Sequence, residues 1–382
     1  MRWATASELL RLVHREPGIT RRTAGEQLGL SSGTLAETVG RLRDASLLTE
    51  TRAAAAGPGR PTTILEPHPR GPLVVVVELR ARDWAVSSGD LAGHTTPVAS
   101  GAIGDEPPAR VLDEVATHVH DVLRASAGRV RAVVVAAAGT VSGTRLVQFT
   151  VRGWTDVELS VLAPEVTVLA GNDATLGGFA EAWTGAAREH AVALHLMVTE
   201  GLGGVLLVDG QPVRGARGRG GEFGHLPFGD PRLACPCGAH GCWGRTVDGE
   251  ALARLAGHPR PTDPEGYARA TLRTGERSAA VEDVAGALGA GIAGLVNAHD
   301  PDVVTIAGLA PLVRAAAPDA FARAYDRGLM LTNRDAPPPI RDSVHGDRGP
   351  ARGALNLGFT HLTEPDALAE WAAEPARPAA RG

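Results

Sequence analysis

The chain has 382 residues and a formal net charge of −5, with 43% hydrophobic and 21% charged residues, as in globular proteins. That length exceeds one ordinary core and predicts more than one domain. All 38 basic residues are arginine, which excludes a lysine Schiff base and phosphate binding by lysine. No secretory signal is recognisable, and apolar runs such as residues 73–79 are too short for a bilayer. We therefore expect a cytoplasmic protein without membrane contact.

The N-terminal part is basic although the whole chain is acidic. Residues 1–61 carry nine arginines and six acidic residues, a balance of +3 that leaves −8 on the remainder. This asymmetry favours nucleic-acid binding confined to the N-terminal part. We predict a winged helix-turn-helix domain over residues 1–65 and a linker over 66–72.

Helical periodicity supports this prediction. Apolar residues recur at helical spacing in residues 6–15, Gly29 separates two further short helices, and Ser31 is the expected N-cap of the second. Four polar residues of that recognition helix are expected on its exposed side, where they would contact bases or phosphates: Ser32, Thr34, Thr38 and Arg41. The alternative is a three-helix structural cap that binds no DNA.

An arginine flanked by glycine and proline follows the helices. Residues 57–62 read GPGRPT, a short, stiff and extended segment. Such a segment fits the narrow minor groove of A·T-rich DNA, where the negative potential is strongest. We predict a DNA-binding arm with Arg60 at its tip, although the same tripeptide is often only a linker.

All three cysteines lie close together, and the first follows His225 by ten positions. The pattern H-x9-C-x-C-x4-C offers four ligands of the kinds that a closed, tetrahedral, structural zinc site uses. The candidate ligands are His225, Cys235, Cys237 and Cys242. Two glycines within the loop would permit its tight turns. His240 is an alternative ligand, and three incidental cysteines are the simpler alternative to a metal site.

These features resemble the ROK family (repressor, open reading frame, kinase), in its transcriptional-regulator branch. The resemblance rests on the head, the GRP arm, the cysteine loop, and the segments NDATLGGFAEAW at 172–183 and GGEFGH at 220–225. It implies an α/β fold in which an N-terminal winged helix-turn-helix precedes a two-lobed, actin-like and hexokinase-like body. The expected lobes are residues 73–171 and, with the zinc loop, 172–365, followed by a partly disordered tail over 366–382.

The resemblance also implies which residues bind a sugar, namely Asn172, Asp173, Glu222 and His225. Asp173 would be the general base of a kinase, or a simple hydroxyl acceptor in a regulator. Without the resemblance, an Asn-Asp pair would be interpreted as a helix cap. His225 would bind zinc through one ring nitrogen and the sugar through the other, and the resemblance favours it over His240 as the metal ligand.

The nucleotide-binding elements of the family are damaged in this sequence. Where its kinases have an acidic residue, glycines and a hydroxyl for the first phosphate loop, this chain has Glu78 and then Arg80, Ala81 and Arg82. Side chains there would fill the space of the phosphates. Glu200 replaces a threonine in the second loop, and Ala307 replaces a glycine. The remaining glycines near residue 203 are interpreted as turns and close packing.

Two sugar contacts of the family are also missing, because Thr150 stands in place of an asparagine and Gly244 in place of a glutamate. Arg152 and Arg245 lie near these positions in the sequence and suggest a sugar phosphate as one possible ligand.

Together these observations predict a regulator, most simply a repressor, that has no catalytic residues. Its expected partners are double-stranded operator DNA and a sugar or sugar phosphate effector, with a structural zinc ion and a homodimeric or homotetrameric assembly. One alternative is an ATP-dependent sugar kinase fused to a DNA-binding domain. Another is a DNA-binding protein that senses no ligand.

Overall fold

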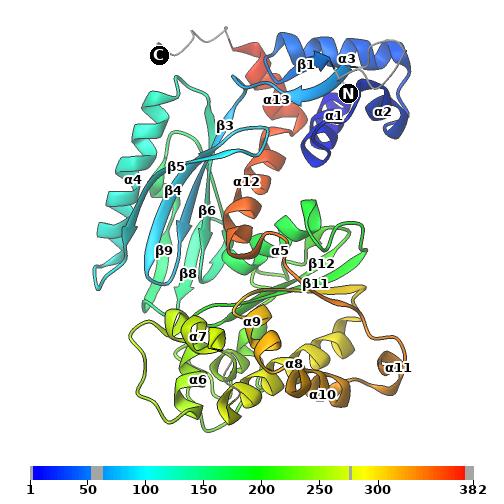
Figure 1. Ribbon diagram of the computed structural model, residues 1–382. Coiled ribbons are helices and arrows are strands. Elements are labelled where there is room, and N and C mark those ends of the chain that lie inside the picture. The colour runs from blue at the N-terminus through cyan, green and yellow to red at the C-terminus, as the bar shows by residue number, and fades with distance from the viewer. Residues whose placement is uncertain (1–2, 53–62, 275–277, 375–382) are drawn as a thin grey trace. The chain divides into compact units, whose positions relative to one another are not determined.

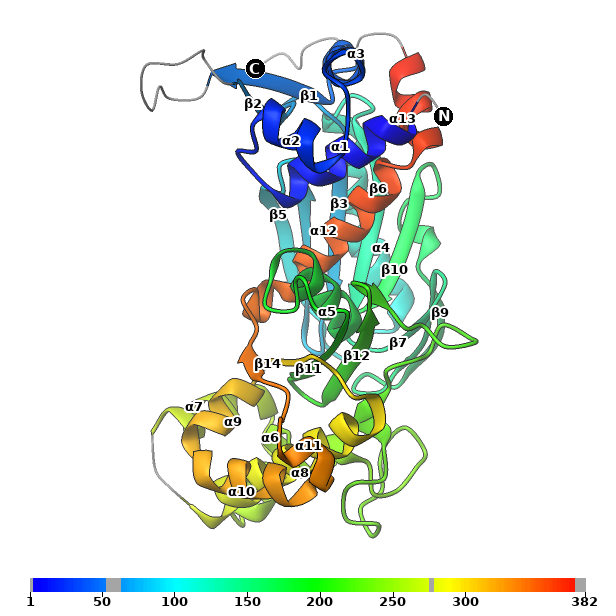
Figure 2. The ribbon, with the colours of Figure 1, turned by 90° about the vertical axis from the view of Figure 1, so that its right-hand side faces the viewer.

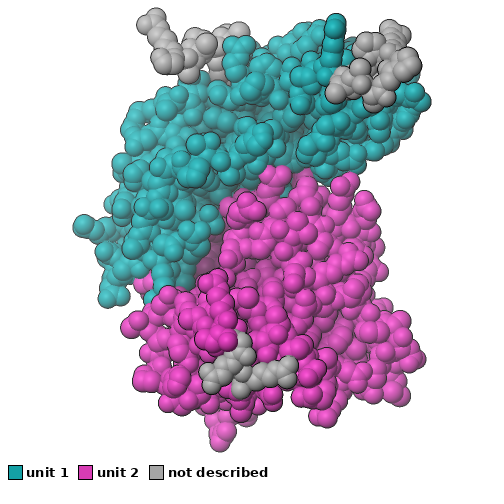
Figure 3. Space-filling view, viewed as in Figure 1, with its two compact units in different colours: residues 1–135, 158–170, 354–382 teal, residues 136–157, 171–353 magenta. Residues whose placement is uncertain are grey.

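The computed structural model describes residues 3–52, 63–274 and 278–374 (Figure 1). The chain forms two compact units, which Figure 3 colours separately. Unit 1 contains residues 1–135, 158–170 and 354–382, and unit 2 contains residues 136–157 and 171–353.

The N-terminal head is a winged helix-turn-helix. Its elements are α1 (Ala4–Arg15), α2 (Arg21–Gln27), α3 (Ser32–Asp44), β1 (Leu48–Arg52) and β2 (Thr63–Pro67). Ser31 is the N-cap of α3, as predicted, because its hydroxyl accepts a hydrogen bond from the Thr34 amide at 3.1 Å. The strands β1 and β2 pair antiparallel as the wing. The predicted arm with Arg60 lies outside the described residues.

The head packs on the part of α12 (Gly349–Leu362) that belongs to unit 1 and on α13 (Pro365–Ala373), and Figure 2 shows α13 beside α1. The buried His14 ring stacks on Phe359, with ring centroids 4.0 Å apart, and Arg11 Nε donates to Thr363 Oγ1 at 3.0 Å. The Trp371 indole donates to the carbonyl of Ala45 at 2.8 Å. These contacts explain why residues distant in sequence share one unit.

The two units differ from the domains predicted from the sequence. The head and most of the first lobe share unit 1, although the sequence suggested separate domains. Residues 136–157 group with unit 2, and residues 354–365 group with unit 1. No local sequence pattern marks either boundary, since both depend on long-range packing.

A five-stranded sheet in the order β10-β6-β3-β4-β5 forms the centre of the first lobe. Its strands are β3 (Leu73–Leu79), β4 (Asp83–Gly89), β5 (Thr95–Ala102), β6 (Val130–Ala137) and β10 (Thr167–Asn172). The valine run of β3 is buried because both faces are covered. Helix α4 (Pro108–Ala125) packs on β3 and β4. On α12, a Cβ added to Gly358 would lie 2.6 Å from the Val74 side chain.

Unit 2 contains a second five-stranded sheet, in the order β13-β12-β11-β14-β15. Its strands are β11 (Val192–Val198), β12 (Leu202–Val208), β13 (Gln211–Pro212), β14 (Val303–Gly308) and β15 (Ile340–Asp342). Helix α5 (Asp173–Thr184) packs on β11 and β12. On this face Ala174 of α5 contacts Met197 and Ala307. A small sheet, also in the described residues, consists of β7 (Thr140–Ser142), β8 (Arg145–Phe149) and β9 (Trp154–Glu158).

Helices cover the other face of this second sheet (Figure 1). They are α6 (Gly249–Leu255), α7 (Pro264–Arg273), α8 (Ala279–His299), α9 (Ala310–Ala316) and α10 (Pro318–Gly328), and the short α11 (Leu331–Arg334) follows them with no buried residue. Leu194, Leu196 and Val198 point into this core, because alternate residues of β11 face opposite sides.

Helix α8 is long and apolar enough to cross a membrane by length and composition. It has 21 residues, and 61% of its most apolar 18-residue window is buried within the protein. Its packing against α10 and in the core of unit 2 accounts for this composition, because a helix surrounded by other elements is hydrophobic on most sides.

Candidate ligand, metal and DNA-binding sites

The loop between η2 (Phe223–His225) and η3 (Trp243–Thr246) brings the three cysteines to His225. One ligand atom from each of His225, Cys235, Cys237 and Cys242 lies within 4.8 Å of all the others. His225 Nδ1 is 3.8 Å from Cys235 Sγ, and Cys237 Sγ is 3.7 Å from Cys242 Sγ. The exposed His240 is not part of this group.

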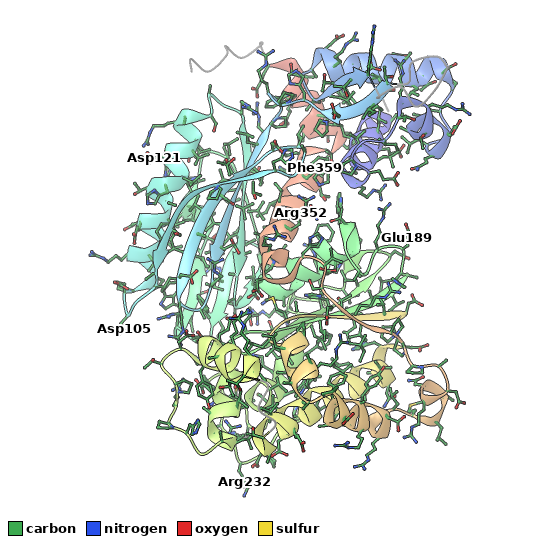
Figure 4. The ribbon with its side chains drawn as sticks, in the orientation of Figure 1. Asp105, Asp121, Glu189, Arg232, Arg352 and Phe359 are labelled. Carbon is green, nitrogen blue, oxygen red and sulfur yellow. The ribbon has the colours of Figure 1, made fainter. Side chains whose placement is uncertain are left out.

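Backbone turns close the cysteine loop. Gly238 and Gly241 have φ values of +98° and +70°, a region that favours glycine. The Cys235 amide donates to the Ala239 carbonyl at 2.8 Å. At the outer part of the loop, Arg232, labelled in Figure 4, pairs with Asp230 at 2.7 Å, so that its charge is satisfied locally. The loop is therefore folded by its own hydrogen bonds around the cluster.

Two thiols of the cluster are held in their neutral form by their surroundings. Burial and the neighbouring thiols raise the pKa of Cys242 to about 12, and burial also raises the pKa of Cys235. A bound divalent cation has the opposite effect because it stabilises thiolates. One imidazole and three thiols make a complete ligand set for a four-coordinate ion, and this cluster could hold one.

Asn172 and Asp173 lie where β10 ends and α5 begins. The Asn172 side chain is held at both ends: its oxygen accepts from the Thr175 amide at 3.0 Å, and its nitrogen donates to the Gly139 carbonyl at 3.1 Å. One Asp173 oxygen accepts from the Ala174 amide at 2.8 Å. Asn172 is therefore the N-cap of α5, the alternative that the sequence left open. The neighbouring Asp173 carboxylate is oriented by the hydrogen bond that it accepts from the Ala174 amide.

The start of β12 lies beside both predicted sugar-binding segments. A Cβ added to Gly203 would lie 2.7 Å from the Ala174 side chain and 3.9 Å from Asn172 Oδ1. A Cβ added to Gly224 would lie 2.0 Å from the Leu202 carbonyl oxygen. These glycines let α5 and the 220–225 segment approach one strand, and they support the interpretation of the remaining glycines as sites of close packing.

Glu222 and His225 flank η2. His225 presents Nδ1 to the thiols, so its Nε2 is the ring nitrogen that remains for another partner. The Glu222 carboxylate has no hydrogen bond or ion pair to another described residue, although the Glu222 carbonyl accepts from the His225 amide at 3.1 Å. The Glu222 carboxylate and the Nε2 atom of His225, three residues apart, thus have no hydrogen-bond partner among the described residues.

The turn from β3 to β4, where the sequence predicted a damaged phosphate loop, is an ion-paired hairpin. Arg80 lies 3.2 Å from Glu78 and 2.6 Å from Asp83, and its amide donates to the Asp83 carbonyl at 2.9 Å. Burial raises the pKa of Glu78, although Arg80 opposes the shift. The arginine that follows the strand is therefore already paired within the turn.

The structure places Gly244 and the two arginines that the sequence suggested for a sugar phosphate. A Cβ added to Gly244 would lie 3.2 Å from the Leu202 amide nitrogen, a close approach that leaves little space for a side chain. Arg245, which the sequence suggested for a sugar phosphate, pairs with Glu250 at 2.8 Å and lies 3.9 Å from Asp248. Arg152 also has an interaction within the protein.

The exposed surface of α3 differs from the prediction at Thr38 and also at Arg41, whose side chain is 14% exposed. Ser32 and Thr34 are exposed, as expected for a recognition helix. Thr38 was predicted to be exposed, but it is buried and its hydroxyl donates to the Thr34 carbonyl at 2.8 Å. It shares the inward face with Leu35 and Leu42, because helix positions three and four apart align. The buried Thr38 is therefore not placed to contact DNA, and this part of the prediction is wrong.

Charged side chains of the head also include some that the prediction omitted. Arg41 pairs with Glu37 at 2.6 Å and lies over the Trp3 ring at 5.8 Å, so only part of its side chain is exposed. Arg22 and Arg43 are more exposed, with 84% and 60% of their side-chain surface accessible. Their exposure depends on the tertiary fold, which the residue type alone does not reveal.

A buried polar network in unit 2 had no sequence signal. The fully buried Glu181 of α5 accepts hydrogen bonds from Ser343 Oγ at 2.5 Å and from the His345 amide at 2.9 Å. His195 of β11 is buried nearby, with Nδ1 2.8 Å from Thr305 Oγ1. Burial lowers the pKa of His195 to about 4. These residues are widely separated in sequence, so only the fold reveals the network.

Comparisons with known proteins agree with this architecture. The family model described as the ROK family matches residues 102–360. An N-acetyl-D-glucosamine kinase of Pectobacterium carotovorum is 31% identical over 204 residues, which cover 49% of this chain and 64% of the relative. A kinase of the same name from Escherichia coli O157:H7 is 31% identical over 207 residues, with 50% and 66% covered. The matches thus span just under two thirds of these relatives.

Solved structures extend the likeness in fold. A ROK family transcriptional regulator, described as a homologue of the E. coli Mlc protein, has a TM-score of 0.76 at 19% identity and covers 97% of this chain and 98% of its own. A ROK hexokinase of Thermus thermophilus has a TM-score of 0.60 at 29% identity, with 76% and 100% covered. A Streptomyces griseus glucokinase in complex with glucose and AMPPNP has a TM-score of 0.63 at 22% identity, with 75% and 98% covered.

Proposed function

Because the chain belongs to the ROK family, we propose that it is a DNA-binding transcriptional regulator of that family, acting as a repressor that senses a sugar or a sugar-derived effector. The observation that carries this proposal is the winged helix-turn-helix head joined to the body. The structural match to a regulator covers 97% of the chain, whereas the matches to the hexokinase and the glucokinase cover 76% and 75%.

The proposed effector site contains Asn172, Asp173, Glu222 and His225. Sugar hydroxyls would donate to the two carboxylates, and the fixed cap geometry of Asn172 supports a defined orientation of Asp173. His225 would donate through Nε2 while Nδ1 faces the thiols. Preference of the effector for one conformation would shift the population of DNA-binding protein.

We propose zinc as the ion of the thiol cluster, held by His225, Cys235, Cys237 and Cys242. Its positive charge would keep the thiols ionised and close the loop. The cluster leaves no ligand position for a reacting water if all four residues bind, so a structural role fits best. His225 would then be fixed in tautomer and direction for its second partner.

We propose that the DNA interface uses Ser32, Thr34 and Arg41 of α3, together with Arg60. A homodimer or homotetramer would place two recognition helices on half-sites about one helical turn of DNA apart, or a multiple of that distance. Exposure of Ser32 and Thr34 supports direct contacts with the major groove.

Binding to labelled DNA from the upstream region of its own gene tests the proposal. We expect S32A/T34A to weaken binding by at least tenfold, since each lost base or phosphate contact costs about 1 kcal/mol or more. The exposed Thr96 of β5 provides a matched control, T96A, which should bind as the unmodified protein does. Equal binding by both variants would contradict the proposed recognition surface.

The alternative function is an ATP-dependent sugar kinase with a fused DNA-binding head. The N-acetyl-D-glucosamine kinases that are 31% identical favour it, and Asp173 would then be the general base. The ion-paired turn around Arg80 argues against it, because a phosphate cradle needs close approach of the backbone. Sugar-dependent release of ADP is the property that distinguishes the two functions.

A further inference from the structure

Three arginines whose guanidinium groups are unpaired precede Glu222. Arg214, Arg217 and Arg219 are exposed, and none of their side chains has a hydrogen bond or ion pair with another residue in the described ranges. Some other exposed arginines are paired, as Arg22 is with Glu26 and Arg232 with Asp230, whereas this loop carries three unpaired ones within six residues. The guanidinium groups of this loop are therefore available to a partner outside the chain.

The loop that carries these arginines is folded back on itself. The Gly220 amide donates to the Arg214 carbonyl at 2.8 Å, which closes the turn between them. Gly215 and Gly218 have φ values of +67° and +70°, so both turns need glycine. The backbone hydrogen bond and the two glycines hold the loop without using any arginine side chain.

The short segment 139–142, which contains β7, contacts both this loop and Asn172. Ser142 Oγ donates to the Arg217 carbonyl at 3.0 Å, and the Asn172 side chain donates to the Gly139 carbonyl at 3.1 Å. Gly139 and Ser142 are three residues apart in the segment of β7, which corresponds to roughly 10 Å of extended chain. All four residues belong to unit 2. The backbone contacts thus keep Arg217 near the proposed effector residues.

The loop is also continuous with Glu222. Only Gly220 and Gly221 separate Arg219 from Glu222, and a Cβ added to Gly221 would lie 2.5 Å from the Gly204 carbonyl oxygen of β12. Glu222 is the only acidic residue between positions 210 and 229. The segment is therefore locally basic in a chain whose net charge is −5.

We propose that Arg217 and Arg219 bind an anionic substituent of the effector, so that the ligand is a monosaccharide carrying a phosphate ester or a carboxylate. The planar guanidinium matches both groups and forms paired, charge-assisted hydrogen bonds with them. This inference rests on the proposed effector function and deepens it, because it assigns a chemical class to the ligand and residues to its recognition. Arg245, by contrast, is engaged with Glu250.

Calorimetric titration of the full-length protein tests the inference. The probes are glucose and N-acetylglucosamine, their 6-phosphates, glucuronate as the carboxylate, and inorganic phosphate alone. We expect at least one anionic sugar to bind about tenfold or more tightly than its neutral parent. Comparison of the phosphates with glucuronate distinguishes the two sources of negative charge, and inorganic phosphate measures any binding that needs no sugar.

Two variants separate the arginine loop from general charge effects. We expect R217Q/R219Q to lose about tenfold or more in affinity for the anionic sugar while the neutral parent binds unchanged. The Arg323 guanidinium of α10 is exposed and has no hydrogen bond or ion pair to a described residue. R323Q is therefore the matched control and should leave the affinity for the anionic sugar unchanged. Circular dichroism of both variants would establish that they remain folded.

The outcomes distinguish this inference from the function on which it rests. If neutral and anionic sugars bind equally, and R217Q/R219Q changes neither, the arginine loop has no role in recognition although the sensor function stands. If no sugar binds at all, the proposed effector function fails and this inference fails with it. If R217Q/R219Q instead reduces the salt dependence of DNA binding, the loop contacts DNA and the inference is overturned.

Discussion

The turn after β3 and the segments around β12 contrast in how their charged groups are used. In the turn, Arg80 is paired with Glu78 and Asp83. In the segments around β12, the Glu222 carboxylate and the guanidinium groups of the 214–219 loop have no hydrogen bond or ion pair to another described residue. Charged side chains that are ion-paired within the fold contribute to its structure. Unpaired charged side chains on a backbone that is fixed by hydrogen bonds are available to a ligand. The contrast favours a chain that retains ligand recognition but not phosphate transfer.

The largest effect is expected at the thiol cluster, which the proposed zinc ion would hold together. Removal of zinc with a chelator, or the substitution C237S, should lower Tm by about 10 °C because the closed loop loses its centre. Elemental analysis should find one zinc per chain. H240A is the matched control, since His240 is exposed and outside the cluster. If C237S kept the Tm and the zinc content of the unmodified protein, the proposed zinc site would be contradicted.

The buried network of Glu181 and His195 predicts a loss of stability in acid. Burial lowers the pKa of His195 to about 4 from 6.5, so the unfolded chain binds a proton that the folded chain does not. Burial acts to raise the pKa of Glu181, but hydrogen bonds from Ser343 and His345 outweigh it and the pKa is lowered. Both shifts give stability that is present at neutral pH and lost as the pH falls.

We expect the free energy of unfolding to fall by about 3 kcal/mol between pH 7 and pH 4.5, most of it from His195. Urea denaturation at several pH values measures this dependence. H195N, which keeps a group able to bond Thr305, should show a flatter profile through the same range. An identical profile in both proteins would mean that His195 is not the group that titrates.

The unengaged Glu222 predicts a smaller effect, confined to ligand binding. E222Q should weaken binding of the effector sugar by about tenfold, because a carboxylate accepts stronger hydrogen bonds than an amide. Thermal shift with and without the sugar measures the loss, since a ligand stabilises only the protein that binds it. The exposed Glu189 offers the control E189Q. Equal ligand shifts in both variants would place the sugar elsewhere.

The smallest effect is expected at Arg80. Its ion pairs are partly exposed, so R80A should change the free energy of unfolding by no more than about 1 kcal/mol. R80A should also fail to bind ATP, because removing one side chain does not recreate a glycine-rich cradle. Calorimetric titration with ATP and Mg²⁺ checks this. Tight binding by R80A would show that a single side chain is the barrier.

Local signals in the sequence predicted much of the head and the metal cluster. Ser31 was identified as a cap because serine accepts from the amide at the start of a helix. The four residues of the cluster were predicted because spacing and residue type both suit one ion, and the family resemblance favoured His225 over His240. The ROK fold followed from motifs that the family match supports. These features depend on residues close together in the chain or on a specific pattern.

The remaining features depend on distant contacts or were misread from residue type. Thr38 was predicted to be exposed because it is polar, although its spacing from Leu35 and Leu42 places it on the inward face. The network of Glu181 and His195 needs residues from α5, β11 and the 343–345 turn, which no periodicity brings together. The two compact units likewise depend on the return of the C-terminal helices to the head.

The measurement that tests the central claim most directly is sugar-dependent ADP release by the full-length protein. The assay uses ATP and Mg²⁺ with hexoses, pentoses and N-acetylglucosamine, and D173N provides the background. A sensor that lacks a phosphate cradle should release no more ADP than D173N with any sugar. Sugar-dependent ADP release that disappears in D173N would contradict the account and identify the protein as a kinase.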